Sequence, residues 1–201
     1  MPPLFPRPNA AFALALSVLL MTGCRPAMST PSATAIQPPA PTREVPLHFV
    51  RHNFEALCFN TTGCKVAYAG RYQVNDAEEK VAPPPPDDLD GLWGPGEIGI
   101  RNFPPPAQVS WKSMDGVAHE ASVDFAGIFS EGLVWHNVPK ADMADFFEGP
   151  VAGSPNIYLE VNDRTINVYM KMLVPTKTEQ IPGNKYSYGR NDVFLVWTHT
   201  Y

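Results

Sequence analysis

Two histidines have a spacing that could hold a metal ion. His48 and His52 are four residues apart, and on a helix this spacing lets two imidazoles share one ion. The surrounding segment Pro46–Phe54 is instead predicted as a strand, in which four residues cover ~13 Å, too far for one ion. We therefore predict two surface or strand-face histidines and no metal site.

The cysteines Cys58 and Cys64 are a second candidate centre. Redox-active pairs typically have the spacing Cys-x-x-Cys, and the longer spacing here argues against redox catalysis. The motifs Gly-x-Ser-x-Gly, Ser-x-x-Lys and His-Glu-x-x-His and the Gly-rich phosphate loops do not occur. A pair of Asp or Glu residues assembled by the fold stays an open alternative. We predict no catalytic residue, no cofactor and no enzyme activity.

The first 25 residues have the three regions of an export signal. Arg7 is followed by an apolar stretch, Ala10–Met21, and by small residues before Cys24. The stretch is ~12 residues long, whereas a membrane span needs ~20. Met21-Thr22-Gly23-Cys24 resembles the lipobox of bacterial lipoproteins, which implies a signal peptide over residues 1–23, cleavage before Cys24 and lipid on that cysteine. The alternative is an ordinary secretory peptide with a chance cysteine.

The same resemblance implies a location. In lipoproteins of two-membrane bacteria an Asp after the acylated cysteine commonly signals inner-membrane retention, and here Arg25 follows Cys24. The implied location is the outer membrane, facing the periplasm, with the acyl chains on Cys24 as the membrane contact. Residues 24–46 are rich in Pro, Ala, Ser and Thr and are predicted to be a disordered tether that reaches roughly 60 Å at ~3.1 Å per residue.

With Cys24 assigned to lipid, an even pair of cysteines remains. An oxidising periplasm would join Cys58 and Cys64, and we predict a disulfide between them. The alternative is two free buried thiols.

The net charge excludes one class of partner. The formal charge is −5, and removal of residues 1–23, which hold one basic and no acidic residue, leaves 14 basic against 20 acidic residues, or −6. Nucleic-acid binding needs a basic surface, so we predict no nucleic-acid partner.

Residues 47–201 are predicted to be a single mainly β domain, a β-sandwich or an antiparallel sheet with one short helix. The helix is predicted at Pro139–Glu148, where Pro139 suits a first helical turn. Hairpin turns are predicted at Met114–Gly116 and at Asn162–Arg164. The predicted strands, which are short β-branched and aromatic runs, are Leu47–Cys58, Lys65–Val74, Gly96–Asn102, Gln108–Ser113, Val117–Phe125, Gly132–His136, Asn156–Val161, Thr165–Leu173 and Asp192–Thr200.

A long proline-containing loop, Ala82–Gly96, is the predicted partner-binding site. Loops of this length without a strand pattern are usually functional or disordered. The loop combines negative charge with large apolar groups of the kind found at interface hot spots. The alternative is a surface loop whose tryptophan lies in the core. The predicted binding residues are Asp87, Asp88, Asp90, Leu92 and Trp93.

The overall plan resembles immunity lipoproteins associated with type VI or type IV secretion effectors. The features that carry the resemblance are Met21–Cys24, Cys58–Cys64, Trp93–Gly96 and Val109–Trp111. It implies stoichiometric inhibition of a secreted antibacterial effector, such as a phospholipase or a peptidoglycan hydrolase. Two alternatives are a structural or accessory lipoprotein of an envelope or secretion assembly, and a cryptic hydrolase of cell wall or lipid.

Overall fold

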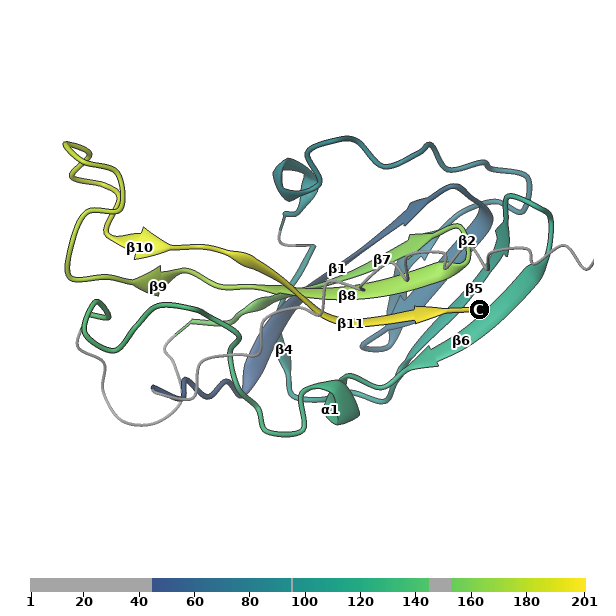
Figure 1. The fold of residues 1–201 in the computed structure, drawn as a ribbon. Coiled ribbons are helices and arrows are strands. Elements are labelled where there is room, and N and C mark those ends of the chain that lie inside the picture. Colours follow the sequence, from purple (N-terminus) through teal and green to yellow (C-terminus); the bar gives the residue numbers. More distant parts are fainter. Residues whose placement is uncertain (1–44, 95, 145–152) are drawn as a thin grey trace, which may run out of the picture. The chain divides into compact units, whose positions relative to one another are not determined.

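The computed structural model describes residues 45–94, 96–144 and 153–201. These residues form a five-stranded and a four-stranded β-sheet that pack face to face around a common core, a two-stranded sheet and one short α-helix (Figure 1). The predicted mainly β fold with one short helix is confirmed. The predicted signal peptide, Cys24 and the tether lie outside the described residues. None of the helices in the described ranges is long and apolar enough to cross a membrane.

The first sheet has five strands in the order β11-β8-β7-β1-β4. Their bounds are β1 Arg51–Phe59, β4 Glu97–Arg101, β7 Asn156–Asn162, β8 Thr165–Lys171 and β11 Val193–Thr200. The second sheet has four strands in the order β3-β2-β5-β6. Their bounds are β2 Thr61–Tyr68, β3 Arg71–Asn75, β5 Ala107–Ser113 and β6 Ala118–Val123.

Strands β1 and β7 are parallel neighbours although they are far apart in the sequence. Asn53 pairs with Asn156, and the register continues without a break to Phe59, which pairs with Asn162. Alternate residues of β1 point into the core, where Phe54 is almost fully buried. This pairing places β1 inside the first sheet, between β7 and β4.

The chain changes sheets directly after β1. Asn60 has a φ of 49°, and β2 then starts in the second sheet. Cys58 at the end of β1 and Cys64 in β2 form a disulfide with Cα atoms 6.5 Å apart, which confirms the predicted pair. The bond therefore ties the two sheets together at their crossing point.

Both predicted hairpin turns are confirmed, and they lie against each other. Gly116 in the β5–β6 turn has a φ of 83° and Asp163 in the β7–β8 turn has a φ of 51°. Asp115 forms an ion pair with Arg164 across the two turns. The Ser113 hydroxyl, which donates to Asp115, and then the Arg164 guanidinium hold the pKa of the Asp115 carboxyl at about 2.

Two strand predictions are wrong. The segment Lys65–Val74 was expected to be one strand, but the chain turns at Ala69 and Gly70, which both have positive φ, and forms β2 and β3. The segment Gly132–His136 is not a strand, because its only ladder contact among the described residues is an isolated bridge from Leu133 to His48.

The helix lies elsewhere than predicted. In the described part of Pro139–Glu148 the amides of Asp142 and Met143 both donate to the Pro139 carbonyl, which makes a single turn. Met143 then pairs with Thr176, so the chain leaves helical geometry to make a long-range β-bridge. Residues 145–148 lie outside the described residues.

The observed helix is α1, Phe125–Ile128, which follows β6. The Asp124 side chain caps its start by accepting from the Ala126 amide at 3.1 Å. Phe125 anchors it in the core, packed against Phe54 and Tyr68. Tertiary packing therefore stabilises an element that is too short to be stable alone.

His52 lies in the core and not at the surface. Its Nδ1 is 2.7 Å from the Asn102 Oδ1 and its Nε2 is 3.0 Å from the Tyr68 hydroxyl. Burial lowers the pKa of His52, against the raising effect of the Asn102 hydrogen bond. His48 is exposed, and in the described part of the chain no His, Cys, Asp and Glu side chains gather as a metal site.

We expect the Cys58–Cys64 disulfide to stabilise the domain. Closing so short a loop limits the unfolded chain and contributes roughly 2–3 kcal/mol in the chain-entropy account. A phosphine reductant should lower the melting temperature of the purified protein, measured by circular dichroism. The double variant Cys58→Ser/Cys64→Ser is the control, and its melt should not respond to the reductant. An unchanged melt of the reduced wild-type protein would contradict the prediction.

Candidate functional site

The long loop Ala82–Gly96 covers the outer face of the five-stranded sheet. Trp93 is only 8% exposed, and its ring stacks on Tyr158 of β7 at a centroid distance of 4.5 Å. The Gly94 amide donates to the Glu55 carboxylate at 2.7 Å. At the other end, the Ala82 amide donates to the Thr61 carbonyl at 2.8 Å. The loop is thus fastened to the five-stranded sheet near its C-terminal end and to β2 of the four-stranded sheet at its N-terminal end.

The predicted partner-binding residues differ in their exposure. Asp87, Asp88 and Leu92 are exposed, whereas Trp93 is buried, so its ring is not an anchor available at the surface. The Asp88 carboxylate accepts from the Gly91 amide at 3.1 Å, beside the 3₁₀ turn Asp90–Leu92. Partner binding by the exposed acidic residues stays a prediction.

A buried carboxylate lies on the same outer face of β7. Glu160 is 2% exposed and accepts a hydrogen bond of 2.6 Å from the Tyr169 hydroxyl. The amides of Asn162 and Asn167 also donate to it. Burial, and then the contact with Glu160, raises the pKa of Tyr169. With its oxygens occupied by neighbours, Glu160 fits a structural role better than acid–base chemistry.

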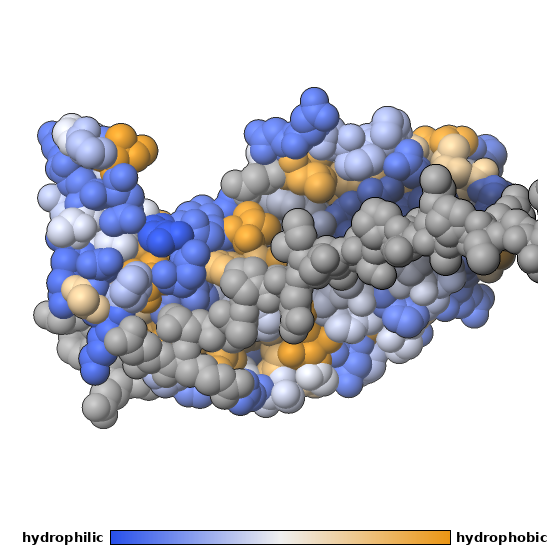
Figure 2. Space-filling view, viewed as in Figure 1, coloured by the Kyte–Doolittle hydropathy of each residue, from blue (hydrophilic) through white to orange (hydrophobic). Residues whose placement is uncertain are grey.

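A projecting hairpin is the strongest candidate for a functional surface. It consists of β9, Val174–Pro175, the connection 176–188, and β10, Gly189–Arg190, and is called the arm below. It extends the strands β8 and β11 away from the sandwich (Figure 1). In Figure 2 an open notch separates the arm from the rest of the surface.

The base of the arm is fixed to the domain. Val174 and Thr176 are buried, and Thr176 forms a β-bridge with Met143. The Lys177 amide donates to the Asp142 carbonyl at 2.8 Å. The segment that was predicted to be a helix therefore serves as a brace for the arm.

The connection at the end of the arm is ordered by its own hydrogen bonds. The Gln180 amide donates to the Ser187 carbonyl at 2.8 Å, and the Ile181 amide donates to the Ser187 hydroxyl at 3.0 Å. The Asn184 side chain accepts from the Tyr186 amide at 3.0 Å. These bonds give the connection a defined conformation before any partner is bound.

This ordered connection exposes large apolar side chains. Tyr186 is 84% exposed and Ile181 is 60% exposed, and Tyr188 is also exposed. In Figure 2 one small hydrophobic area lies at the end of the arm, among mostly hydrophilic residues. Exposed aromatic groups on a preorganised loop are typical of interface anchors, because little conformational entropy is lost when they bind.

The sequence contained a signal for the arm that the strand prediction did not use. The predicted strands end at Leu173 and resume at Asp192, which leaves a gap of 18 residues with no assigned element. In that gap Ile181, Tyr186 and Tyr188 stand among turn-forming Pro, Gly, Asn and Ser residues. Because binding residues are often carried by loops, large apolar residues among turn-forming ones mark this gap as a candidate binding loop.

Comparisons of the chain with models of known protein families, with curated proteins and with solved structures found no match.

We expect Trp93→Ala to destabilise the protein. Truncation of a buried aromatic side chain costs about 3–5 kcal/mol, and here it removes the stacking on Tyr158. Leu92→Ala is the matched control, because Leu92 is exposed in the same turn and its truncation should change the free energy of unfolding by less than about 0.5 kcal/mol. Urea denaturation followed by circular dichroism measures the free energy of unfolding of both variants. An equal decrease in Trp93→Ala and Leu92→Ala would show that Trp93 does not fasten the loop.

Proposed function

We propose that this chain is a lipid-anchored protein of the bacterial cell envelope that binds and inhibits a secreted antibacterial enzyme. The observation that carries the proposal is the arm, an ordered projection with exposed tyrosines and an isoleucine at its end. A rigid projecting loop can enter the active-site cleft of an enzyme without first paying an ordering cost, which favours tight inhibition.

The charge of the chain supports a partner of opposite sign. The formal net charge of −5 would steer a basic enzyme toward the protein and raise the association rate. Asp87 and Asp88, exposed on the loop over the five-stranded sheet, add acidic groups outside the arm. Specific contacts at the arm would then determine the lifetime of the complex.

The predicted anchor supports the same role. Lipid on Cys24 and a tether over residues 24–46 would hold the domain near the membrane, where an incoming enzyme acts. Confinement of this kind raises the effective concentration of an inhibitor without any new contact.

We expect partner binding to depend on the arm. Affinity purification of the tagged full chain from the native organism, with mass spectrometry, should recover one secreted enzyme in near-equal amount when effectors are delivered. The double variant Ile181→Ala/Tyr186→Ala should lower its recovery at least tenfold, because both truncated side chains are exposed and the core is untouched.

The matched control is Tyr72→Ala, which removes an exposed tyrosine from β3 and should leave recovery unchanged. Equal losses in both variants, or none in the arm variant, would contradict binding by the arm. Recovery of fixed envelope components with no secreted enzyme would instead favour the structural or accessory lipoprotein.

We expect Cys24→Ser to release the protein from the membrane. Serine cannot carry the thioether-linked lipid, so the variant should appear in the soluble fraction after cell disruption, whereas the wild type should sediment with membranes. Cys58→Ser/Cys64→Ser is the control, because it removes cysteines of the folded domain and should still sediment. Continued sedimentation of the Cys24→Ser variant would reject lipidation.

A further inference from the structure

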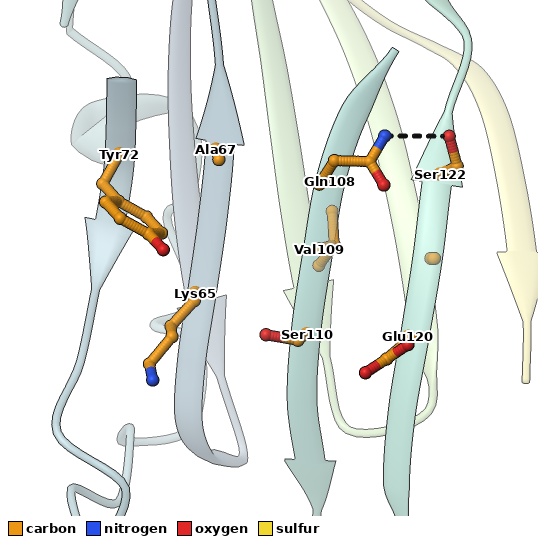
Figure 3. A pocket seen from close by; sticks show the side chains of 9 residues that line it. Lys65, Ala67, Tyr72, Gln108, Val109, Ser110, Glu120 and Ser122 are labelled. Carbon is orange, nitrogen blue, oxygen red and sulfur yellow. Dashed lines mark hydrogen bonds between the residues drawn. The ribbon is translucent and has the colours of Figure 1, made fainter. Parts of the chain in front are cut away.

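The outer face of the four-stranded sheet carries a groove that is distinct from the arm (Figure 3). Its central part has a volume of about 490 Å³. Small side chains, Ala67, Ser110 and Ser122, form the floor, and larger side chains such as Tyr72 and Glu120 stand at its sides (Figure 3).

Depressions at both ends lengthen the central part. One of about 440 Å³ shares Ala67, Tyr72 and Gln108 with it and reaches the β2–β3 turn. Another, of about 300 Å³, shares Ser110 and Glu120 with it and reaches the opposite end of β2. The groove therefore follows the strands, and a strand as long as β2 spans roughly 26 Å at ~3.3 Å per residue. A chain of several units fits better than a single small molecule.

The groove offers polar groups that the fold does not use. Among the residues drawn in Figure 3, the only hydrogen bond is from the Gln108 amide to the Ser122 hydroxyl at 3.1 Å. In the described ranges, the side chains of Lys65 and Glu120 take part in no ion pair. The Gln108 amide nitrogen also donates to the Pro106 carbonyl at 3.0 Å, so it is occupied. The Ser110 hydroxyl, the Gln108 amide oxygen, the Lys65 ammonium and the Glu120 carboxylate are the groups available to a ligand.

The charges of the groove are balanced. Lys65 and Lys112 are matched by Glu78 and Glu120 in the central part and at the end of about 300 Å³. Arg71, which lines the end at the β2–β3 turn, is paired with Glu97. A polyanion such as a nucleic acid would need an excess of basic groups. Balanced charge favours a ligand that is uncharged but rich in hydrogen-bonding groups.

The position of the groove within the sheet argues against an extended peptide. The centre of its floor is made by β2 and β5, which are interior strands, so their backbone groups are already paired with neighbouring strands. A peptide that adds to a sheet needs a free strand edge. The floor presents side chains only, which suits a ligand that is recognised through hydroxyl groups.

Tyr72 provides an exposed aromatic ring on which a sugar can stack. Its side chain is 59% exposed, leans over the groove beside β2, and makes no ring contact with another described aromatic residue (Figure 3). An aromatic ring offers apolar area on its face and a hydroxyl at its edge. The apolar face of a pyranose ring can stack on it while the sugar hydroxyls reach Gln108 and Ser110.

We propose that this groove binds an oligosaccharide chain, with Tyr72 as the stacking platform. The inference does not rest on the inhibitor function, because it concerns another face and other residues. The proposed ligand is a chain of uncharged pyranose units. Two kinds of sugar chain have this chemistry: one with N-acetyl groups and one with hydroxyl groups only.

Isothermal titration calorimetry of the full chain with chitotetraose and with cellotetraose tests the proposal and separates the two sources. The detergent that keeps the lipidated chain in solution should have no sugar headgroup, because such a headgroup would compete with the oligosaccharide for the groove. At least one tetrasaccharide should bind saturably, and Tyr72→Ala should weaken that binding tenfold or more. Ser110→Tyr, which fills the floor, should weaken it as well.

Tyr186→Ala is the matched control, because it removes an exposed tyrosine from the arm and should leave sugar binding unchanged. Absence of saturable binding to both sugars, equal binding by wild type and Tyr72→Ala, or preferred binding of tetra-alanine in the same groove would overturn the proposal. None of these results would bear on the arm, so failure of this proposal and failure of the inhibitor function are distinguishable.

Discussion

The parallel pairing of β1 with β7 is the constraint on which the rest of the structure depends. It joins residues 53–59 to residues 156–162, so the first sheet cannot form until the two halves of the domain meet. Because the chain leaves this sheet directly after β1, the same pairing determines where β2 starts the second sheet. The Cys58–Cys64 disulfide lies at that change of sheet and holds the two sheets in place. On its other side β8 pairs with β11, and the arm lies between these two strands in the sequence.

Local patterns predicted most of the strands but not their pairing. The two hairpins were predictable because Asp-Gly and Asn-Asp sequences favour turns with positive φ. The parallel β1–β7 contact has no local signal, since it depends on residues about a hundred positions apart. In the described part of Pro139–Glu148 the predicted helix does not form for the same reason: Met143 pairs with Thr176 on the arm, and this long-range contact overrides local helical preference.

The candidate site was only partly predictable. The sequence correctly marked the loop Ala82–Gly96 as unusual, and it left open whether Trp93 was buried or exposed. That choice depends on whether an aromatic partner lies beneath the loop, and Tyr158 of β7 provides one. The arm was missed because its strands are two residues long, too short for a periodic pattern, and its order comes from hydrogen bonds within the connection. Large apolar residues among turn-forming ones were visible in the sequence, but their exposure is seen only in the fold.

Site-specific photocrosslinking in cells tests the central claim, that the end of the arm is the partner-binding surface, most directly. A photoreactive amino acid replaces Tyr186 in one strain and Met114, an exposed residue of the β5–β6 turn, in another. Irradiation during effector delivery should give one dominant adduct with a secreted enzyme from position 186 and none from position 114. The same adduct from both positions, or adducts only from position 114, would contradict the account.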